Sequence, residues 1–248
     1  MTLKTANTGG ALPMPVRGVI GAYTGTLGRP ARGNEPGVLA GEPAGVALSM
    51  LIKDSWTNPA TASTTAYIST ALTGATYQPN NSTVVTARGA SWDGTLGSTG
   101  KPPHPRNVVV TTTHSSAVVA CTVTVTGKDL YGRTITEAFT VSAGGTSQTN
   151  TGTTAFWQVD SITIASASNC TANSTQLGTG AVLGLSMPNA VASAVKEIAA
   201  GSVVTNGVFT AMSTSANADK RGTYAPNSAP DGSRDYTVWY ICDDPSAL

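Results

Sequence analysis

The alternation of apolar and polar residues along the chain predicts β-strands far more often than helices. The clearest pattern spans residues 106–141, where two strand-like runs flank a turn between Gly127 and Gly132. In the first run, Val119–Val125, the odd positions are apolar and threonines alternate with them. This period of two is typical of a strand with one buried face. We therefore expect a β-hairpin, with Arg133–Ser142 as its return strand, at the centre of the fold.

One residue does not fit this hairpin. Glu137 falls on the same face of the return strand as Ile135, Phe139 and Val141. Burying an unpaired carboxylate is costly, so the position needs an explanation. The sequence leaves four explanations open: a β-bulge, an ion pair with Arg133 or another cation, a subunit contact, and a catalytic role. The catalytic role is the least favoured, because no second acid is evidently placed to work with Glu137.

Several further runs have the pattern of strands. The apolar phase of residues 154–166 switches at Asp160-Ser161, which predicts a bulge or a bend. Residues 190–200 fit a strand slightly better than a short helix capped by Asn189. Asn206-Gly207 lies between two β-branched runs and predicts a hairpin turn. Residues 77–100 and 166–180 have the composition of loops. The other expected strands are 45–53, 65–69, 108–113, 180–187 and 236–242.

The last of these strands, Tyr236–Cys242, is apolar on both faces. Tyr236 and every second residue after it share one face, and Trp239 and Ile241 share the other. This pattern suits a strand that is buried on both sides. Alternatively, Trp239 and Ile241 form a seam with another subunit, and we carry them forward as interface candidates.

The first 60 residues differ from the rest, because glycine or proline recurs every few positions along most of them. Such a segment rarely holds a long regular element, since proline fixes φ and lacks a donor while glycine weakens helix and strand alike. A plain linker would lack the apolar residues that are spaced along it. We expect an extended arm that lies on a surface of its own or a neighbouring subunit. The interface candidates within it are Val16, Ile20, Tyr23 and Leu27.

These elements together predict an all-β protein. Its core is an antiparallel β-sandwich, with an extended Gly/Pro-rich N-terminal arm and a second small β region on the C-terminal side. The expected division is 1–60 for the arm, 61–187 for the sandwich, and 188–248 for a C-terminal region that packs on the sandwich or on a neighbouring subunit.

Composition and charge narrow the possible functions. Charged residues are only 11% of the chain and the net charge is +1, which argues against a nucleic-acid binder with its concentrated basic face. The N-terminus lacks a secretory signal pattern, and no apolar run approaches the length of a membrane helix. The three cysteines have no metal-knuckle spacing, and no phosphate-binding loop, dinucleotide fingerprint or nucleophile elbow occurs. We therefore expect no cofactor, no metal and no enzymatic activity.

Two stretches resemble known proteins. The motif G-K-D-L-Y-G-R-T-I-T-E-A-F-T-V, then a Gly/Thr-rich loop and A-F-W-Q-V-D-S-I-T-I, is similar to the β-sandwich module of small tailed-phage virion proteins, including head decoration (cement) proteins. The segment Arg221–Tyr240 resembles the C-terminal part of phage structural proteins encoded near the capsid gene. Both are turn-and-strand patterns and carry no active-site signature.

The resemblance implies a structural protein of the virion. Such a protein would be made in the host cytoplasm, sit on the capsid surface and stabilise the shell by bridging neighbouring capsid subunits. Its partners would be the major capsid protein and further copies of itself, with a trimer favoured over a dimer. The alternative is a head-fibre, tail or host-attachment protein whose β-sandwich binds carbohydrate, with Trp92 or Trp157 as a stacking platform. A glycoside hydrolase is more distant, because no carboxylate pair is evident.

Overall fold

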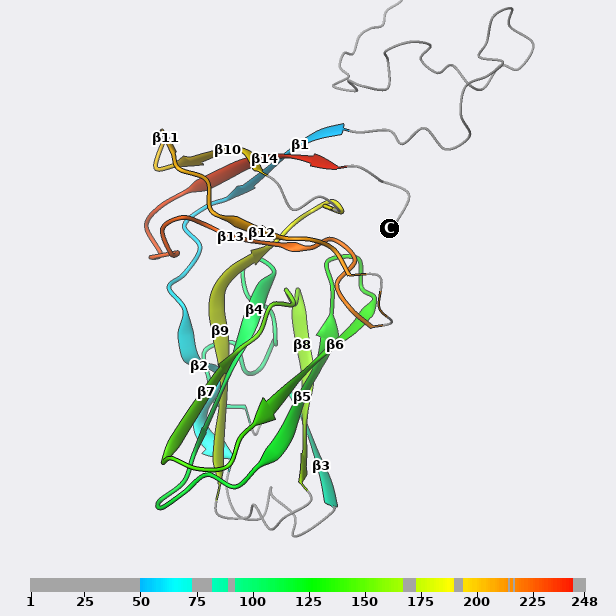
Figure 1. Cartoon of the computed structure of the whole chain (residues 1–248), viewed down its shortest axis with the longest axis vertical. Coiled ribbons are helices and arrows are strands. Elements are labelled where there is room, and N and C mark those ends of the chain that lie inside the picture. The colour runs from blue at the N-terminus through cyan, green and yellow to red at the C-terminus, as the bar shows by residue number, and fades with distance from the viewer. Residues whose placement is uncertain are drawn as a thin grey trace, which may run out of the picture.

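The computed structural model confirms the all-β prediction. Its described residues contain no helix, and their strands form three antiparallel sheets (Figure 1). The residues described are 50–72, 82–88, 92–166, 173–189, 194–213, 215 and 217–242.

The strands are short to medium in length, and most pair with strands far away in the sequence. In chain order they are β1 (Met50–Trp56), β2 (Ser63–Leu72), β3 (Ser82–Ala87), β4 (Arg106–Thr113), β5 (Cys121–Lys128), β6 (Thr134–Val141), β7 (Ser147–Thr151), β8 (Gln158–Ser166), β9 (Ser174–Gly184), β10 (Ala194–Ala199), β11 (Ser202–Val204), β12 (Val208–Thr210), β13 (Thr223–Ala225) and β14 (Tyr236–Cys242).

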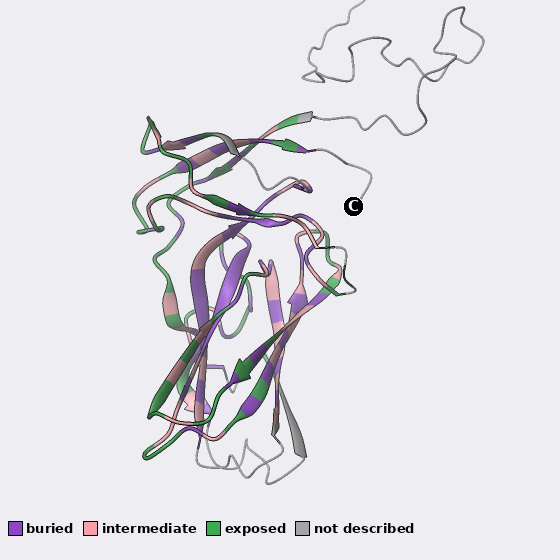
Figure 2. Cartoon of the chain, viewed as in Figure 1, coloured by how far each residue is buried: buried purple, intermediate pink, exposed green. Residues whose placement is uncertain are grey.

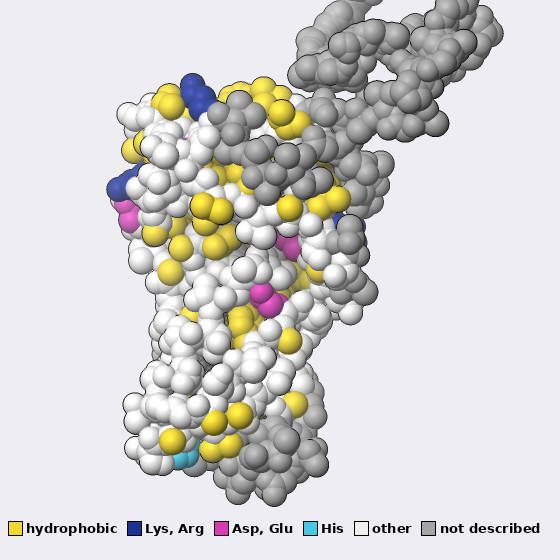
Figure 3. Space-filling view, viewed as in Figure 1, with side chains coloured by type: hydrophobic (Ala, Val, Ile, Leu, Met, Phe, Trp, Pro, Cys, Tyr) yellow, Lys and Arg dark blue, Asp and Glu magenta, His cyan; other side chains and the backbone are white. Residues whose placement is uncertain are grey.

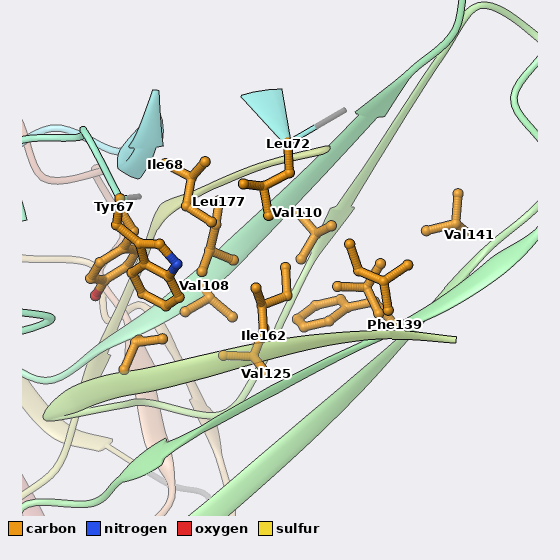
Figure 4. Close-up of a cluster of buried hydrophobic side chains, with 14 of the residues drawn as sticks. Tyr67, Ile68, Leu72, Val108, Val110, Val125, Phe139, Val141, Ile162 and Leu177 are labelled. Carbon is orange, nitrogen blue, oxygen red and sulfur yellow. The ribbon is translucent and has the colours of Figure 1, made fainter. Parts of the chain in front are cut away.

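Two of the sheets face each other as a β-sandwich in the lower part of Figure 1. One has the order β12-β13-β9-β4-β7, with β2 also paired to β9, and the other has the order β3-β8-β5-β6. Their inner faces meet in one apolar cluster. Figure 4 shows Ile68 and Leu177 of the first sheet facing Ile162 and Val125 of the second. Burial of these β-branched and leucine side chains is the main stabilising term of the sandwich.

The central hairpin forms as the sequence predicts. The register of β5 with β6 runs without interruption from Cys121 opposite Val141 to Lys128 opposite Thr134. The large apolar residues of both strands are buried, and Thr122 on the opposite face is exposed. The period-two pattern therefore identified both the strands and the buried face.

The predicted irregularity near Asp160 is a β-bulge. Along β5, Thr126 pairs with Ser161 whereas Gly127 pairs with Val159, so Asp160 is the extra residue of β8. The bulge brings the two apolar phases of β8 to the same side, and both Val159 and Ile162 are buried in the sandwich core.

Strand β9 connects the two halves of the molecule. Its lower portion lies between β2 and β4, and its upper end pairs with β13. The sequence assigned residues 174–180 to a loop, and this prediction is wrong. Apart from Leu177 in the core, the buried residues of this stretch are threonines and glycines, and β2 runs close by: a Cβ on Gly178 would lie 1.8 Å from the backbone oxygen of Ser63. Apolar periodicity does not detect a strand segment in which one large apolar residue stands among buried threonines and glycines.

A second loop prediction was wrong for the same kind of reason. Residues 82–87 form the edge strand β3, which pairs with β8 over six consecutive positions, from Ser82 with Ser166 to Ala87 with Ser161. Only Val84 and Val85 in this strand are large and apolar. The partner strand, and not the local pattern, makes this segment a strand.

The upper part of the molecule consists of the third sheet, with the order β1-β14-β10-β11, and the strands β12 and β13 beneath it (Figure 1). A second apolar cluster, rich in aromatic side chains, lies between them. Trp56 stacks on Tyr224 with ring centroids 6.2 Å apart, and Phe209 contacts Tyr224 at 4.5 Å. Strand β1, which the sequence placed at the end of the arm, is thus an integral strand of this sheet. The proposed domain boundaries remain a prediction.

The strand predicted within residues 190–200 is confirmed as β10. The hairpin predicted at Asn206-Gly207 is wrong, because β11 pairs with β10 and β12 pairs with β13. The turn instead lies at Ala200 and Gly201, whose φ values of 49° and 79° are those of a tight β-hairpin. Gly207 is required for a different reason: a Cβ there would lie 2.0 Å from the backbone oxygen of Ala225.

Candidate interaction surface

The outer face of the upper sheet carries the largest exposed apolar side chains of that sheet. The strand register places Leu51 of β1 opposite Ile241 of β14, and puts Lys53 and Lys196 on either side of Trp239. Residues directly opposite each other in antiparallel strands share a face. We call this face the upper-sheet face; it consists of Leu51, Lys53, Lys196, Ile198, Val203, Trp239 and Ile241.

The two faces of β14 differ in burial. Tyr236 and the alternate residues that follow it are fully buried in the upper core, whereas Trp239 is half-buried and Ile241 is 38% exposed. The prediction that β14 is buried on both sides is therefore wrong for the single chain. No further layer of the described residues covers the outer side. Leu51 and Val203, at 43% and 64% exposed, extend the uncovered area across the sheet (Figure 2).

The charged side chains on this face, Lys53 and Lys196, are both positive. The Lys53 ammonium lies 5.7 Å from the centroid of the Trp239 ring, at a distance typical of a cation–π contact. Among the outward positions of the described strands β1, β10, β11 and β14, no residue is acidic. An apolar patch with positive charges beside it suits a partner surface that is apolar and acidic. Hydrophobic side chains also gather mainly in the upper part of the view in Figure 3.

The first and the last described residues lie beside this face. Met50, the first described residue, pairs with Cys242, the last. The arm candidates Val16, Ile20, Tyr23 and Leu27 lie outside the described residues. The structure therefore tests neither their contacts nor their distance from Trp239.

A partly buried ionic cluster connects the tip of the central hairpin to the upper part of the molecule. Within the β5–β6 turn, Arg133 Nε lies 3.0 Å from Asp129 Oδ2. Opposite it, Arg221 Nε lies 2.9 Å from Asp219 Oδ1, and both of these side chains are buried. The two guanidinium groups lie 5.6 and 5.9 Å from the centroid of the Tyr131 ring. The cluster is a structural connection between the halves, and sequence reasoning did not predict it.

Two more buried carboxylates hold the upper sheet in place. Asp54 accepts hydrogen bonds from Ser186 N at 2.7 Å and from the Tyr240 hydroxyl at 3.1 Å. Burial raises the pKa of Tyr240, and the neighbouring Asp54 charge raises it further. The hydroxyl therefore stays protonated and donates to the carboxylate.

Glu197 has the same structural function on β10. Its Oε2 atom accepts hydrogen bonds from Gly207 N at 2.8 Å, from Asn227 N at 3.3 Å and from the Tyr224 hydroxyl. Burial raises the pKa of Tyr224, as does its hydrogen bond to Glu197. Each carboxylate thus satisfies donors from separate segments of the chain. Neither could be identified from sequence, because each pattern shows only one acid in an apolar strand.

The structure explains Glu137 in a way that the sequence did not suggest. Its Oε1 atom accepts hydrogen bonds from the backbone N–H groups of Thr153 and Thr154, at 2.7 and 3.2 Å. The bulge explanation is wrong because the β5–β6 register is regular, and the pairing with Arg133 is wrong because Arg133 pairs with Asp129. The close packing also requires Gly152, where a Cβ would lie 2.2 Å from Glu137 Oε2.

The pH dependence of stability should report on Glu137. Burial raises the pKa of this carboxyl above its ordinary value of 4.5, against the lowering effect of the hydrogen bonds from Thr153 and Thr154. A raised folded-state pKa favours the protonated folded protein, so this contribution is present below about pH 4.5 and is lost as the pH rises through the folded-state pKa. As the pH rises from about 4.5 through the folded-state pKa of Glu137, we expect the unfolding free energy of the wild type to fall relative to that of Glu137→Gln. Urea unfolding at a series of pH values measures it, and parallel profiles for the two proteins would contradict the assignment.

The tryptophans proposed as carbohydrate platforms are in different environments. Trp92 is 3% exposed and packs edge-on against Tyr67, with ring centroids 6.3 Å apart. It is therefore a core anchor, and the hypothesis that it stacks on a ligand is wrong. Trp157 is half-buried, and its ring lies 5.9 Å from the Lys101 ammonium.

The described residues contain no group of three or more His, Cys, Asp or Glu side chains that could hold a metal ion. The ring nitrogen Nδ1 of His114 accepts a backbone hydrogen bond from Ser116 at 2.9 Å, a local structural contact. Cys121 and Cys242 are buried in the two parts of the core, and Cys170 lies outside the described residues.

No described helix is both long and apolar enough to span a membrane. Comparison with known proteins gave no match: no protein-family model matches the chain, and neither does a curated protein or a solved structure.

Proposed function

We propose that this protein is a non-enzymatic structural component of a tailed-phage virion, where it decorates the capsid and stabilises it by bridging neighbouring capsid subunits. The observation that supports this proposal is the upper-sheet face, an exposed apolar surface with lysines on a four-stranded antiparallel sheet. This proposal rests on the structure of the surface together with the resemblance of the central hairpin to decoration proteins.

The chemistry of the described residues supports binding over catalysis. The buried carboxylates Asp54, Glu197 and Asp219 are each engaged by donors that hold the fold together. In contrast, Trp239 and Ile241 are held in fixed positions by the central strand of the upper sheet and remain accessible. A preorganised aromatic and aliphatic pair of this kind is typical of the centre of a protein interface.

A shell surface offers such a molecule many identical partners. Each copy needs only a modest contact, because a copy that bridges two capsid subunits makes its second contact at high effective concentration. The low net charge of the chain limits the repulsion between copies that are crowded on one surface.

Binding to capsids tests the proposal directly. Particles of the phage that encodes the chain, prepared without the protein, are mixed with purified wild type or with Trp239→Ala. If Trp239 is an interface anchor, its truncation should cost about 2 kcal/mol or more, which is roughly a thirtyfold rise in the dissociation constant. Co-sedimentation with the particles measures the affinity.

The matched control is Trp157→Ala, which removes a half-buried tryptophan that also lies near a lysine but far along the chain from the upper sheet. Circular dichroism checks that both variants stay folded. Equal affinity of Trp239→Ala and wild type would contradict the assignment of the upper-sheet face, and failure of the wild type to bind particles would contradict the proposed function itself.

A further inference from the structure

Strand β7 presents a regular edge to an additional strand. Among the described residues it pairs only with β4, over five consecutive positions from Ser147 with Thr113 to Thr151 with Val109. Its side chains are exposed or half-buried along the whole strand (Figure 2). The strand contains no charged residue, no proline and no bulge. Proteins commonly protect a sheet edge with one of these features, because a plain edge can pair with another strand.

Two hydrogen bonds that flank the β4–β7 ladder show which backbone groups of β7 face away from β4. His114 N donates to Thr146 O at 3.0 Å, and Gly152 N donates to Val108 O at 2.9 Å. In an antiparallel pair, hydrogen-bonded positions alternate with positions whose backbone groups point away from the partner. The even-numbered residues of β7 therefore bond to β4, and the N–H and C=O groups of the odd-numbered residues point to the open edge. The odd-numbered residues are Ser147, Thr149 and Thr151.

The sequence of β7 is complementary to itself. When two copies of the strand lie antiparallel with Thr149 opposite its own counterpart, Ser147 lies opposite Thr151 and Gln148 lies opposite Asn150. Hydroxyl side chains then meet hydroxyl side chains, amides meet amides, and no like charges face each other. Cross-strand pairs of this kind are favourable in antiparallel sheets. Because each strand presents the same surface to the other, the two copies are related by a twofold axis.

The same register also matches the backbone groups of the two strands. With Thr149 on the axis, every residue that points its N–H and C=O groups to the open edge lies opposite a residue that does the same. Each such pair can exchange two hydrogen bonds, as in an ordinary antiparallel ladder. A shift by one residue would instead place these groups opposite residues whose backbone groups already bond to β4. The register about Thr149 is therefore the one that the backbone favours.

Side chains on both faces of β7 fit this arrangement. Gln148 Nε2 donates to Gly144 O at 2.8 Å, which leaves its Oε1 atom to accept a hydrogen bond from the amide of Asn150 in the second copy. On the outer face, the Thr149 hydroxyl oxygen lies 3.4 Å from that of Thr111 on β4. A second copy would continue this row of hydroxyl groups across the axis.

Two other sheet edges are less suited to pairing with themselves. On β6, the N–H group of Thr136 donates to Asn217 O at 2.7 Å, so a loop already occupies that edge. On β1, antiparallel pairing about the central residue would place two copies of Lys53 opposite each other, and like charges in that position are destabilising. Strand β7 has neither obstacle.

We propose that β7 of one copy pairs with β7 of a second copy about a twofold axis at Thr149, so that the sheet of β9, β4 and β7 continues through a homodimer. The contact is short, so the dimer should be weak and should form as the protein concentration rises. A twofold contact produces a dimer, whereas the sequence favoured a trimer. The inference concerns a different part of the molecule from the upper-sheet face and does not depend on what that face binds.

Sedimentation velocity of the full-length chain over a range of concentrations tests the dimer. Thr149→Pro removes the donor at the axis but no hydrogen bond to β4, and edge strands accept proline where the N–H group points outward. We expect the wild type to form dimers, and Thr149→Pro to raise the dissociation constant about tenfold or more. A wild type that stays monomeric at every concentration, or a Thr149→Pro variant that associates as the wild type does, would overturn the proposal.

Thr149→Lys and Thr140→Lys form a matched pair of variants, because both threonines are exposed on edge strands. Thr149→Lys places two positive charges opposite each other at the axis and should weaken association about fivefold or more. Thr140→Lys on β6 should leave association unchanged, and so should Leu51→Arg on the upper-sheet face. Association that is lost in Leu51→Arg and kept in Thr149→Lys would show a dimer through the upper-sheet face and would overturn pairing through β7.

Hydrogen exchange locates the contact within the strand. The amides of Gln148 and Asn150 bond to β4, so they should be protected at every protein concentration. The amides of Ser147, Thr149 and Thr151 should exchange rapidly in the monomer and gain protection as the concentration rises. A dimer in which these three amides stay unprotected would contradict the proposed pairing.

Discussion

The Arg221→Ala variant is expected to lose about 3–5 kcal/mol of unfolding free energy, because it breaks a buried ion pair and leaves a charge without its partner. Arg221 is fully buried, and its Nε and one Nη atom donate to Asp219 at 2.9 and 3.2 Å. Burial raises the pKa of Asp219 and the Arg221 charge opposes that shift. Without Arg221, the carboxylate would have to take up a proton or remain buried as an uncompensated charge.

The loss should also disturb the connection between the two halves. Arg221 lies 5.9 Å from the Tyr131 ring at the hairpin tip, and its backbone oxygen accepts a hydrogen bond from Asn189 N at 2.9 Å. Urea unfolding, followed by fluorescence and by circular dichroism, measures the change. Arg234→Ala is the control, because its ion pair with Asp231 is exposed and such pairs contribute little. A loss for Arg221→Ala as small as that of the control would contradict the structural role of the cluster.

The Glu197→Ala variant should lose about 3 kcal/mol or more. The substitution removes the acceptor of Gly207 N, Asn227 N and the Tyr224 hydroxyl, and each buried donor left without a partner costs about 1–3 kcal/mol. Glu197 is completely buried, so water cannot readily replace it. Thermal or urea unfolding gives the change.

The neighbouring residue supplies a matched control for this prediction. Lys196 precedes Glu197 on β10 but is exposed on the upper-sheet face, so Lys196→Ala should change stability by no more than about 0.5 kcal/mol. Hydrogen exchange at Gly207 should accelerate in Glu197→Ala and not in the control. A Glu197→Ala variant as stable as the wild type would show that the three hydrogen bonds are not important for the upper core.

The elements that could be predicted from sequence are those in which one face is apolar and the other is not. Cys121–Lys128 has this pattern and forms a strand with the expected buried side chains. Tyr236–Cys242, which is apolar on both faces, also forms the predicted strand, but only the face of Tyr236 is fully buried. Of Ser174–Gly184, the part from 180 on was predicted as a strand, but 174–179 was not, because Leu177 is its one large apolar residue and its other buried positions are threonine and glycine. The hairpin predicted at Asn206-Gly207 was wrong for a related reason. Gly207 is needed because a neighbouring backbone passes close to it, and it does not form a hairpin turn.

The candidate surface was predictable only in part. The sequence pattern of the last strand identified Trp239 and Ile241 as the outward pair, but their neighbours Leu51 and Val203 depend on a strand register that no local pattern encodes. The buried ionic groups were missed because their partners come from distant segments, as in Asp54 with Ser186 and Tyr240. A single acid in an apolar strand gives no sign of which donors will surround it.

We propose that this chain is a structural protein on the outside of a phage capsid and is held there through the upper-sheet face. The most direct measurement is electron cryomicroscopy of purified particles of the encoding phage, with and without the protein. Compared with particles that lack the protein, wild-type particles should show additional density on the outer shell at every equivalent position between capsid subunits. In this density, the strand that carries Trp239 and Ile241 should face the shell. Wild-type particles without this additional density on the shell, or with the protein only on the tail, would contradict the proposal.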